Sequence, residues 1–249
     1  MRLRWQNSTI VALGACLLWS CGQSPSSANS QAAAPLSLEV IDSIKEDKRE
    51  VVTVPPPVYD YDTSLWTDIH LIDASIILDL KYATTDNFVK EKMYECGRCL
   101  LRPPVAKAIF LAHQKLQKQG LGLKMLDCYR PRPIQQKLWD KVPNASYVTP
   151  PAKGSMHNRG SAVDLTIVRS NGEELDMGTP FDFFGPRAHH TYTKLPDSIQ
   201  ANRQLLRSTM KEVGLRPIRT EWWHYYYPNS PYELSDMLWD CDEHQASGT

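Results

Sequence analysis

Two histidines and two carboxylates in two distant segments most constrain how this chain can fold. His157 and Asp164 lie in KGSMHNRGSAVDL, and Glu221 and His224 lie in EWWHYYY. Two imidazoles and one carboxylate suit a hydrolytic zinc ion, because three protein ligands leave the fourth tetrahedral position open for water. The remaining carboxylate, Glu221, would take the proton of that water. A fold that serves this chemistry must bring the two segments together.

The first segment also has a purely structural interpretation. A lone histidine in a polar, glycine-flanked stretch such as that around His157 is usually a surface loop residue. Asp164 is harder to explain in this way, because it interrupts SAVDLTIV, an apolar run with the composition of a strand. A buried carboxylate needs a cation or hydrogen-bond donors to remain charged. A metal ion would meet that need.

The second segment poses a geometric problem. The aromatic composition of PIRTEWWHYYY favours a strand, and residues three apart in a regular strand point to opposite faces. Glu221 and His224 would then be a rim glutamate and a core histidine. If they share one site, the chain must be distorted near Trp222 and Trp223.

Arg130, in DCYRPRP, is a further candidate. It follows an expected strand and precedes a helix opened by Pro133. A guanidinium stays charged and presents a rigid set of donors, so it could hold an oxyanion near a metal ion. The ordinary alternative is a salt-bridged surface arginine.

The first twenty residues have the features of a targeting segment. Arg2 and Arg4 precede a short apolar stretch over residues 10–19, which is too short to span a bilayer. It ends in LWSC, as in a bacterial lipoprotein signal, so we expect lipidation at Cys21. LGAC, ending at Cys16, is a second candidate with a shorter apolar stretch, and an ordinary secretory signal is the remaining alternative.

The chain then divides into a linker and a domain. Residues 21–63 contain SPSSANSQAAAP, IDSIKEDKRE and VPPPV, which are typical of a flexible tether that buries no core. Residues 64–249 are expected to form one domain, since 249 residues with 42% hydrophobic content suffice for an ordinary core. The formal net charge is zero, so nothing in the charge indicates nucleic-acid binding.

Periodicity predicts both helices and strands in this domain. We expect helices after Pro103, in IQQKLWDKV and in DSIQANRQLLRSTMKEVG, the last with Asp197 as N-cap and Gly214 as stop. Strands are expected in IHLIDASIILDLKYAT, LGLKMLDCY, SAVDLTIV and PIRTEWWHYYY. Without a regular alternation of strand and helix, the fold class is α+β.

Four cysteines follow the tether: Cys96, Cys99, Cys128 and Cys241. An exported protein meets an oxidising compartment, where structural disulfides form. Four cysteines allow three pairings, and the sequence leaves the choice open.

Six segments together carry a family resemblance. In chain order they are KYATTDNF, CLLRPPVAKA, LDCYRPRP, KGSMHNRGSAVDLT, FDFFGPRAHH and TEWWHYYY. They resemble the zinc D-alanyl-D-alanine dipeptidases of the VanX type, from about residue 67 to residue 227. The patterns SxHxxGxAxD and ExWH are specific to this family and its D,D-carboxypeptidase relatives, and the order of the segments favours the dipeptidases.

The resemblance implies a fold and a catalytic centre. The fold would be a single α+β domain with a small mixed or antiparallel sheet, packed helices and the zinc site at the sheet. His157, Asp164 and His224 match the ligands of one Zn²⁺ per chain. Glu221 matches the catalytic acid/base, and Arg130 matches the residue that stabilises the transition state.

The resemblance also implies substrate contacts. Ser155, Tyr82 and Tyr94 match residues of the substrate pocket, although the stretch before Cys96 is shorter than in the relatives. Asp182 matches the acid that binds the free ammonium of the dipeptide, which would be costly to bury unpaired. Cys128 stands where the family usually has glycine.

The expected function is hydrolysis of D-alanyl-D-alanine or a similar D,D-dipeptide in cell-wall turnover or scavenging. The enzyme would be exported to the periplasm or cell envelope and held at a membrane by its lipid. One alternative is a D,D- or L,D-carboxypeptidase acting on peptidoglycan stem peptides. The other is a non-catalytic lipoprotein that binds wall peptides.

Overall fold

The computed structural model describes residues 65–241. The expected signal segment 1–20, the tether 21–63 and the lipidation site Cys21 lie outside these residues. Within them, no helix combines the length and apolar character that crossing a membrane requires.

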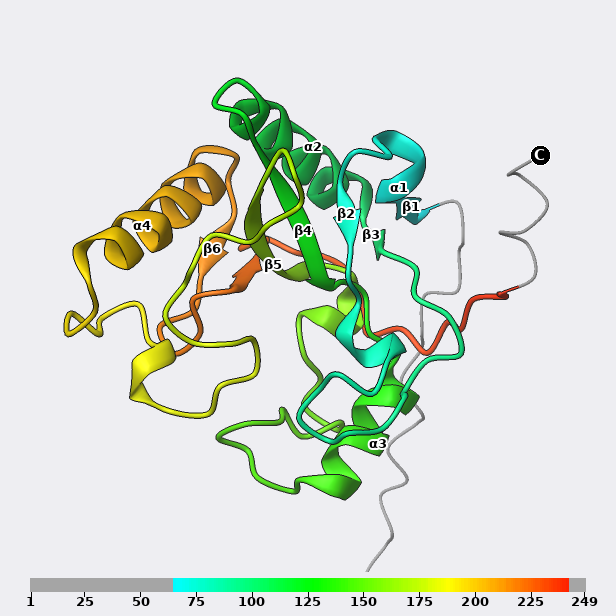
Figure 1. Ribbon diagram of the computed structural model, residues 1–249. Coiled ribbons are helices and arrows are strands. Elements are labelled where there is room, and N and C mark those ends of the chain that lie inside the picture. Colours follow the sequence, from blue (N-terminus) through cyan, green and yellow to red (C-terminus); the bar gives the residue numbers. More distant parts are fainter. Residues whose placement is uncertain (1–64, 242–249) are drawn as a thin grey trace, which may run out of the picture. The chain divides into compact units, whose positions relative to one another are not determined.

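A five-stranded mixed sheet forms the centre of the domain (Figure 1). Its strands, in spatial order, are β2 (Ile77–Leu78), β4 (Leu121–Asp127), β5 (Ala162–Arg169), β7 (His224–Tyr226) and β6 (Arg216–Pro217). Only β2 and β4 run parallel, and the other neighbours are antiparallel. A separate antiparallel pair joins β1 (Thr67–Asp68) to β3 (Leu100–Leu101).

Helices and short 3₁₀ turns surround this sheet. The α-helices are α1 (Ile69–Ile72), α2 (Pro103–Gln117), α3 (Arg132–Lys141) and α4 (Asp197–Glu212), and the 3₁₀ turns are η3 (Lys81–Ala83), η4 (His157–Arg159) and η5 (Pro186–Ala188). Helix α2 packs on β4 and on α4, whereas α3 lies beyond the end of β4 (Figure 1). The mixed sheet with separate helices makes this an α+β domain, as expected.

The core lies between the central strands and α2. Seven of the eight residues of β5 are buried, which explains why its sequence is mostly apolar apart from Asp164 and Thr166. On α2, Val105, Ile109, Ala112 and Leu116 form an apolar face that is fully buried. The helix expected after Pro103 is present and begins at that residue.

Two expectations about local structure are wrong. Residues 69–72, expected in a strand, form α1 because the Asp68 side chain accepts a hydrogen bond from the backbone N–H of His70 and caps the turn. Asp197 is the first residue of α4 and not its N-cap, a position taken by Pro196. The stop at Gly214 is confirmed, since this residue has φ of +91°.

The last expected strand is divided in two. Residues 216–217 and 224–226 form β6 and β7, and the chain bends at Trp222 and Trp223. Both indoles are buried, and the Trp222 indole N–H donates to Thr179 Oγ1 at 2.8 Å. The distortion predicted between Glu221 and His224 is therefore present.

Two disulfides settle the pairing that the sequence left open. Cys96 is bonded to Cys241, and Cys99 is bonded to Cys128. The first bond joins the end of the described chain to the loop before β3, and the second joins that loop to the end of β4.

Candidate metal centre

The three central strands bring three acidic or imidazole side chains to one point of the sheet. In the strand register, Asp164 on β5 lies opposite Asp127 on β4 and opposite His224 on β7. Glycine allows the tight turn that leads into β5, because Gly160 has φ of +65° and follows η4 directly. His157 of η4 thereby lies next to the strand pair, and the two distant segments of the sequence meet.

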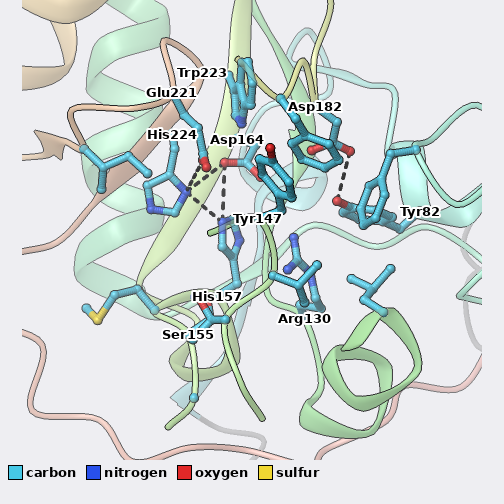
Figure 2. Close-up of a pocket in the computed structure, with 18 of the residues that line it drawn as sticks. Tyr82, Arg130, Tyr147, Ser155, His157, Asp164, Asp182, Glu221, Trp223 and His224 are labelled. Atoms are coloured by element: carbon cyan, nitrogen blue, oxygen red, sulfur yellow. Dashed lines mark hydrogen bonds and ion pairs between the residues drawn. The ribbon is translucent and has the colours of Figure 1, made fainter. Parts of the chain in front are cut away.

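Three atoms of this group have the spacing of metal ligands (Figure 2). His157 Nε2 lies 3.1 Å from His224 Nδ1, His224 Nδ1 lies 3.0 Å from Asp164 Oδ1, and His157 Nε2 lies 3.4 Å from that same oxygen. Tetrahedral zinc with ligand bonds of about 2.0–2.1 Å would separate its ligand atoms by about 3.4 Å. All three side chains are buried. The residues present therefore fit a zinc ion in chemistry and spacing.

The His157 ring is held in the orientation that this site needs. Its Nδ1–H donates to the main-chain carbonyl oxygen of Cys128 at 2.7 Å, so Nε2 carries the lone pair that faces Asp164 and His224. Asp127 Oδ2 lies 3.5 Å from the same Nδ1.

The charges of the group support one another. Burial by itself opposes ionisation of Asp164, but His157 and His224 beside it hold the pKa of this carboxyl well below its usual range. Burial likewise disfavours the charged form of His157, yet Asp164 raises the pKa of this imidazole above its usual value. Asp164 therefore remains a carboxylate, which is the form that binds a metal ion.

Glu221 lies at the edge of the ligand group. Because the chain bends after it, its Oε2 approaches His224 Nδ1 to 4.0 Å although three residues separate them. Burial, reinforced by the charge of Asp164, raises the pKa of Glu221. A carboxyl group with a raised pKa beside a metal site is well suited to accept and return a proton.

Arg130 is fixed by two partners. Its Nε and Nη2 both donate to Asp127 Oδ2, at 3.0 and 2.6 Å, and its Nη1 donates to Gln135 Oε1 at 3.0 Å. The guanidinium carbon lies 4.7 Å from the centre of the Tyr82 ring. Its orientation is therefore set before any ligand binds.

Asp182 lies across the cavity from the ligand group (Figure 2). Tyr82 donates its hydroxyl to Asp182 Oδ2 at 3.0 Å. Burial and the charge of Asp164 raise the pKa of Asp182 well above its usual value. Asp182 also has φ of +57°, a conformation uncommon for residues other than glycine. Such strain concentrates at functional sites.

One cavity of about 280 Å³ is lined by the three candidate ligands and by Glu221, Arg130, Tyr82 and Asp182. This is slightly below the ~300–1,000 Å³ typical of pockets for drug-sized ligands, so it suits a small substrate. Three of the aromatic side chains that line it form a border: Phe184 stacks on Tyr147 with ring centres 4.4 Å apart and meets Phe88 at 5.0 Å. Ser155 also lines the cavity, and its Oγ accepts the backbone N–H of His157 at 3.1 Å.

The model of the peptidase M15 family, described as D-ala-D-ala dipeptidase, matches residues 63–240. This chain belongs to that family. It is 37% identical to the D-alanyl-D-alanine dipeptidase of Escherichia coli. That alignment covers 72% of this chain and 94% of the relative. The chain is 34% identical to that of Enterococcus faecalis over 62% and 87% of the two lengths. Family membership makes the protein a metallopeptidase.

Similarity to solved structures is weaker. The LD-carboxypeptidase LdcB is 18% identical in sequence, with a TM-score of 0.37. The superposition covers 53% of this chain and 61% of the LdcB chain. At that score the superposition adds nothing to the geometry of the site.

Tyr94 was expected in the substrate pocket but lies outside it. Tyr94 is buried against Trp239, with ring centres 5.0 Å apart, and does not line the cavity. It belongs to the cluster that also contains Tyr82 and Ile134. The shorter stretch before Cys96 ends in the disulfide with Cys241, which places this loop beside Trp239.

Several residues of the site were not predicted from the sequence. Asp127 and Gln135 hold Arg130, and Tyr147, Phe184 and Phe88 form the aromatic border. A carboxylate at the end of an apolar strand was a usable signal for Asp127. Phe88 and Phe184 lie in two of the segments that carry the family resemblance, but the sequence does not indicate that they meet each other and Tyr147, because the three come from separate loops.

Proposed function

We propose that this protein is a zinc dipeptidase that hydrolyses D-alanyl-D-alanine or a closely similar D,D-dipeptide, with one Zn²⁺ per chain bound by His157, Asp164 and His224. The observation that carries the proposal is a small cavity lined both by a candidate metal site and by the half-buried carboxyl of Asp182. A dipeptide has its free ammonium within one residue of the scissile bond. A site for short peptides therefore needs both groups in one cavity.

The roles follow from the contacts. Zinc, when bound, would polarise the scissile carbonyl and lower the pKa of a water ligand towards about 7. Glu221, near His224 and with a raised pKa, takes the proton of the attacking water and passes it to the leaving amine. Arg130, already oriented by Asp127, donates to the oxygen that becomes negative.

The substrate end of the cavity selects for a free N-terminus. An ammonium next to Asp182 would stabilise the ionised carboxylate, whose burial is otherwise unfavourable. Tyr82, by donating to the same carboxylate, fixes its direction. Ser155 borders the cavity beside His157 and supplies a hydroxyl for substrate. An acylated N-terminus would leave the Asp182 carboxylate without a cationic partner, so a carboxypeptidase acting on longer peptides fits this site less well.

The test is a substrate panel assayed with the purified full chain and one equivalent of zinc. D-Ala-D-Ala should release D-alanine, N-acetyl-D-Ala-D-Ala should be cut about 10–100-fold more slowly, and L-Ala-L-Ala should be a poor substrate. A difference of that size matches the loss of a charged hydrogen bond, about 1.5–3 kcal/mol. Equal cleavage of the acetylated peptide would assign the carboxypeptidase function instead, and absence of any hydrolysis would leave the binding lipoprotein.

We also propose that the protein is exported and lipidated at Cys21. The apolar stretch ending in LWSC and the linker-like residues 21–63 support this, as do two disulfides, which persist in oxidising compartments. Labelled palmitate should enter the full chain and should be lost in Cys21→Ser but not in Cys16→Ser. Label retained in Cys21→Ser would exclude this site.

A further inference from the structure

The segment from Asp127 to Arg130 holds His157 from several directions. The Cys128 carbonyl accepts the His157 Nδ1–H at 2.7 Å, and the Arg130 backbone N–H donates to the His157 carbonyl at 3.1 Å. Asn158 adds a third bond, from its Nδ2 to the Arg130 carbonyl at 2.7 Å. Both the ring and the main chain of His157 therefore depend on where this segment lies.

The segment itself lies beyond the regular part of the sheet. The register between β4 and β5 shifts between Met125 and Asp127, and β4 ends at Asp127. Beyond Asp127, two bonds connect the segment to β3 and the residue before it. The Tyr129 backbone N–H donates to the Leu100 carbonyl at 3.1 Å, and Cys128 forms a disulfide with Cys99. The disulfide is the covalent one of the two.

Cys99 provides a fixed point for this tie. It is fully buried, and its carbonyl accepts the backbone N–H of Ile69 at 3.0 Å. Cys128 is also buried, at 1% exposure. A bond with both sulfurs shielded from solvent acts as a permanent clamp and not as a redox switch.

The other disulfide offers a natural comparison. Cys96–Cys241 spans 145 residues, against 29 for Cys99–Cys128. In the chain-entropy account, the longer loop should stabilise the fold more. Its link to the segment that holds His157 is indirect: the Trp239 indole N–H donates to the Cys96 carbonyl, and the Trp239 ring lies 6.2 Å from the Tyr129 ring. Neither Cys96 nor Cys241 belongs to that segment, whereas Cys128 does.

We propose that the Cys99–Cys128 disulfide is a positioning element for the metal site, acting on His157 through the Cys128 carbonyl; this rests on the zinc site proposed above. A histidine ligand is oriented by the group that hydrogen-bonds its other ring nitrogen, the one that does not bind the metal. Disturbing such groups typically weakens metal binding about 10–100-fold. Here that partner is a main-chain oxygen, so its position depends on the anchors of its own segment. The disulfide provides that anchor.

The test compares two double variants of the full chain, Cys99→Ala/Cys128→Ala and Cys96→Ala/Cys241→Ala. Zinc dissociation constants are measured by competition with a chelator, and Co²⁺ spectra report the coordination geometry. We expect about 10-fold weaker zinc binding and an altered Co²⁺ spectrum in the first variant. The second should keep both properties while its melting temperature falls further. A third variant, Cys99→Val/Cys128→Ala, refills part of the space left by the sulfurs and should bind zinc as weakly as the first.

Unchanged zinc affinity in both variants of the Cys99–Cys128 pair, or an equal loss in the Cys96–Cys241 control, would overturn the proposal. So would failure of both variants of the pair to fold with zinc present, because the bond would then serve folding. If the wild-type chain bound no zinc, the proposed function would fail first. The wild-type measurement therefore separates the two failures.

Discussion

Asp164 and His224 are direct cross-strand neighbours, with Asp164 Oδ1 3.0 Å from His224 Nδ1 across β5 and β7. This pairing brings the two ends of the site together, because β5 follows the His157 turn and β7 follows the bend that carries Glu221. The position of the candidate metal site is thus set by the register of the sheet.

Asp164→Asn should remove metal binding while keeping the shape of the side chain. The amide carries no charge to balance a dication, so we expect zinc affinity to fall by at least about 100-fold. Chelator competition and metal analysis after dialysis measure this. Asp140→Asn, at an exposed position on α3, is the matched control and should bind zinc like the wild type. Stoichiometric zinc in dialysed Asp164→Asn would contradict the ligand assignment.

Glu221→Gln should separate catalysis from metal binding. The glutamine keeps the size of the side chain but cannot accept the proton, so kcat should drop about 10²–10⁴-fold with zinc still bound. In the wild type, Glu221 must be ionised to act, and its pKa is raised. Activity should therefore fall, as pH decreases, at a higher pH than the value of about 4.3 of an ordinary glutamate. A variant with near-normal kcat would show that another group is the base.

Asp182→Asn should weaken substrate binding but stabilise the empty protein. Loss of the charged partner of the substrate ammonium should raise KM about 10–100-fold for D-Ala-D-Ala, as measured by initial rates. The folded-state pKa of Asp182 is raised by burial, so the wild type loses stability as pH rises from the unfolded value of about 3.9 through the folded value.

The asparagine variant does not titrate at that position and should lack this loss. Urea unfolding of both proteins without substrate, at pH 4 and pH 7, tests the sign. The variant should gain stability relative to the wild type as pH rises. A relative loss would mean that Asp182 is stabilised as a carboxylate, contrary to its surroundings.

Phe184→Ala should relax the selection for small substrates. The Phe184 ring stacks on Tyr147 and contacts Phe88 at the cavity border, so its removal opens space beside the site. We expect kcat/KM for D,D-dipeptides with larger side chains to rise about 10-fold relative to that for D-Ala-D-Ala. Leu71→Ala, at an exposed position on α1, is the control. An unchanged ratio would exclude Phe184 from substrate selection.

Much of the fold could be predicted because it is encoded locally. The apolar face of α2, the prolines in the first turns of α2 and α3, and the apolar character of β5 are all short-range patterns, and each of these elements lies where its pattern indicated. Asp164 was conspicuous for the same reason, as a charge inside an apolar strand. Even the bend at Trp222 followed from a local rule, once Glu221 and His224 were required to share a site.

The sequence by itself therefore determined the ligand types, the main helices and the central strands, since these depend on neighbours a few residues apart. Only the tertiary structure decided the cysteine pairing, the partners of Arg130, the aromatic border of the cavity and the position of Tyr94 outside it. Each of these depends on which loops meet, and they meet across separations such as the 145 residues between Cys96 and Cys241. Local sequence patterns do not predict such contacts, because they depend on the packing of the whole domain.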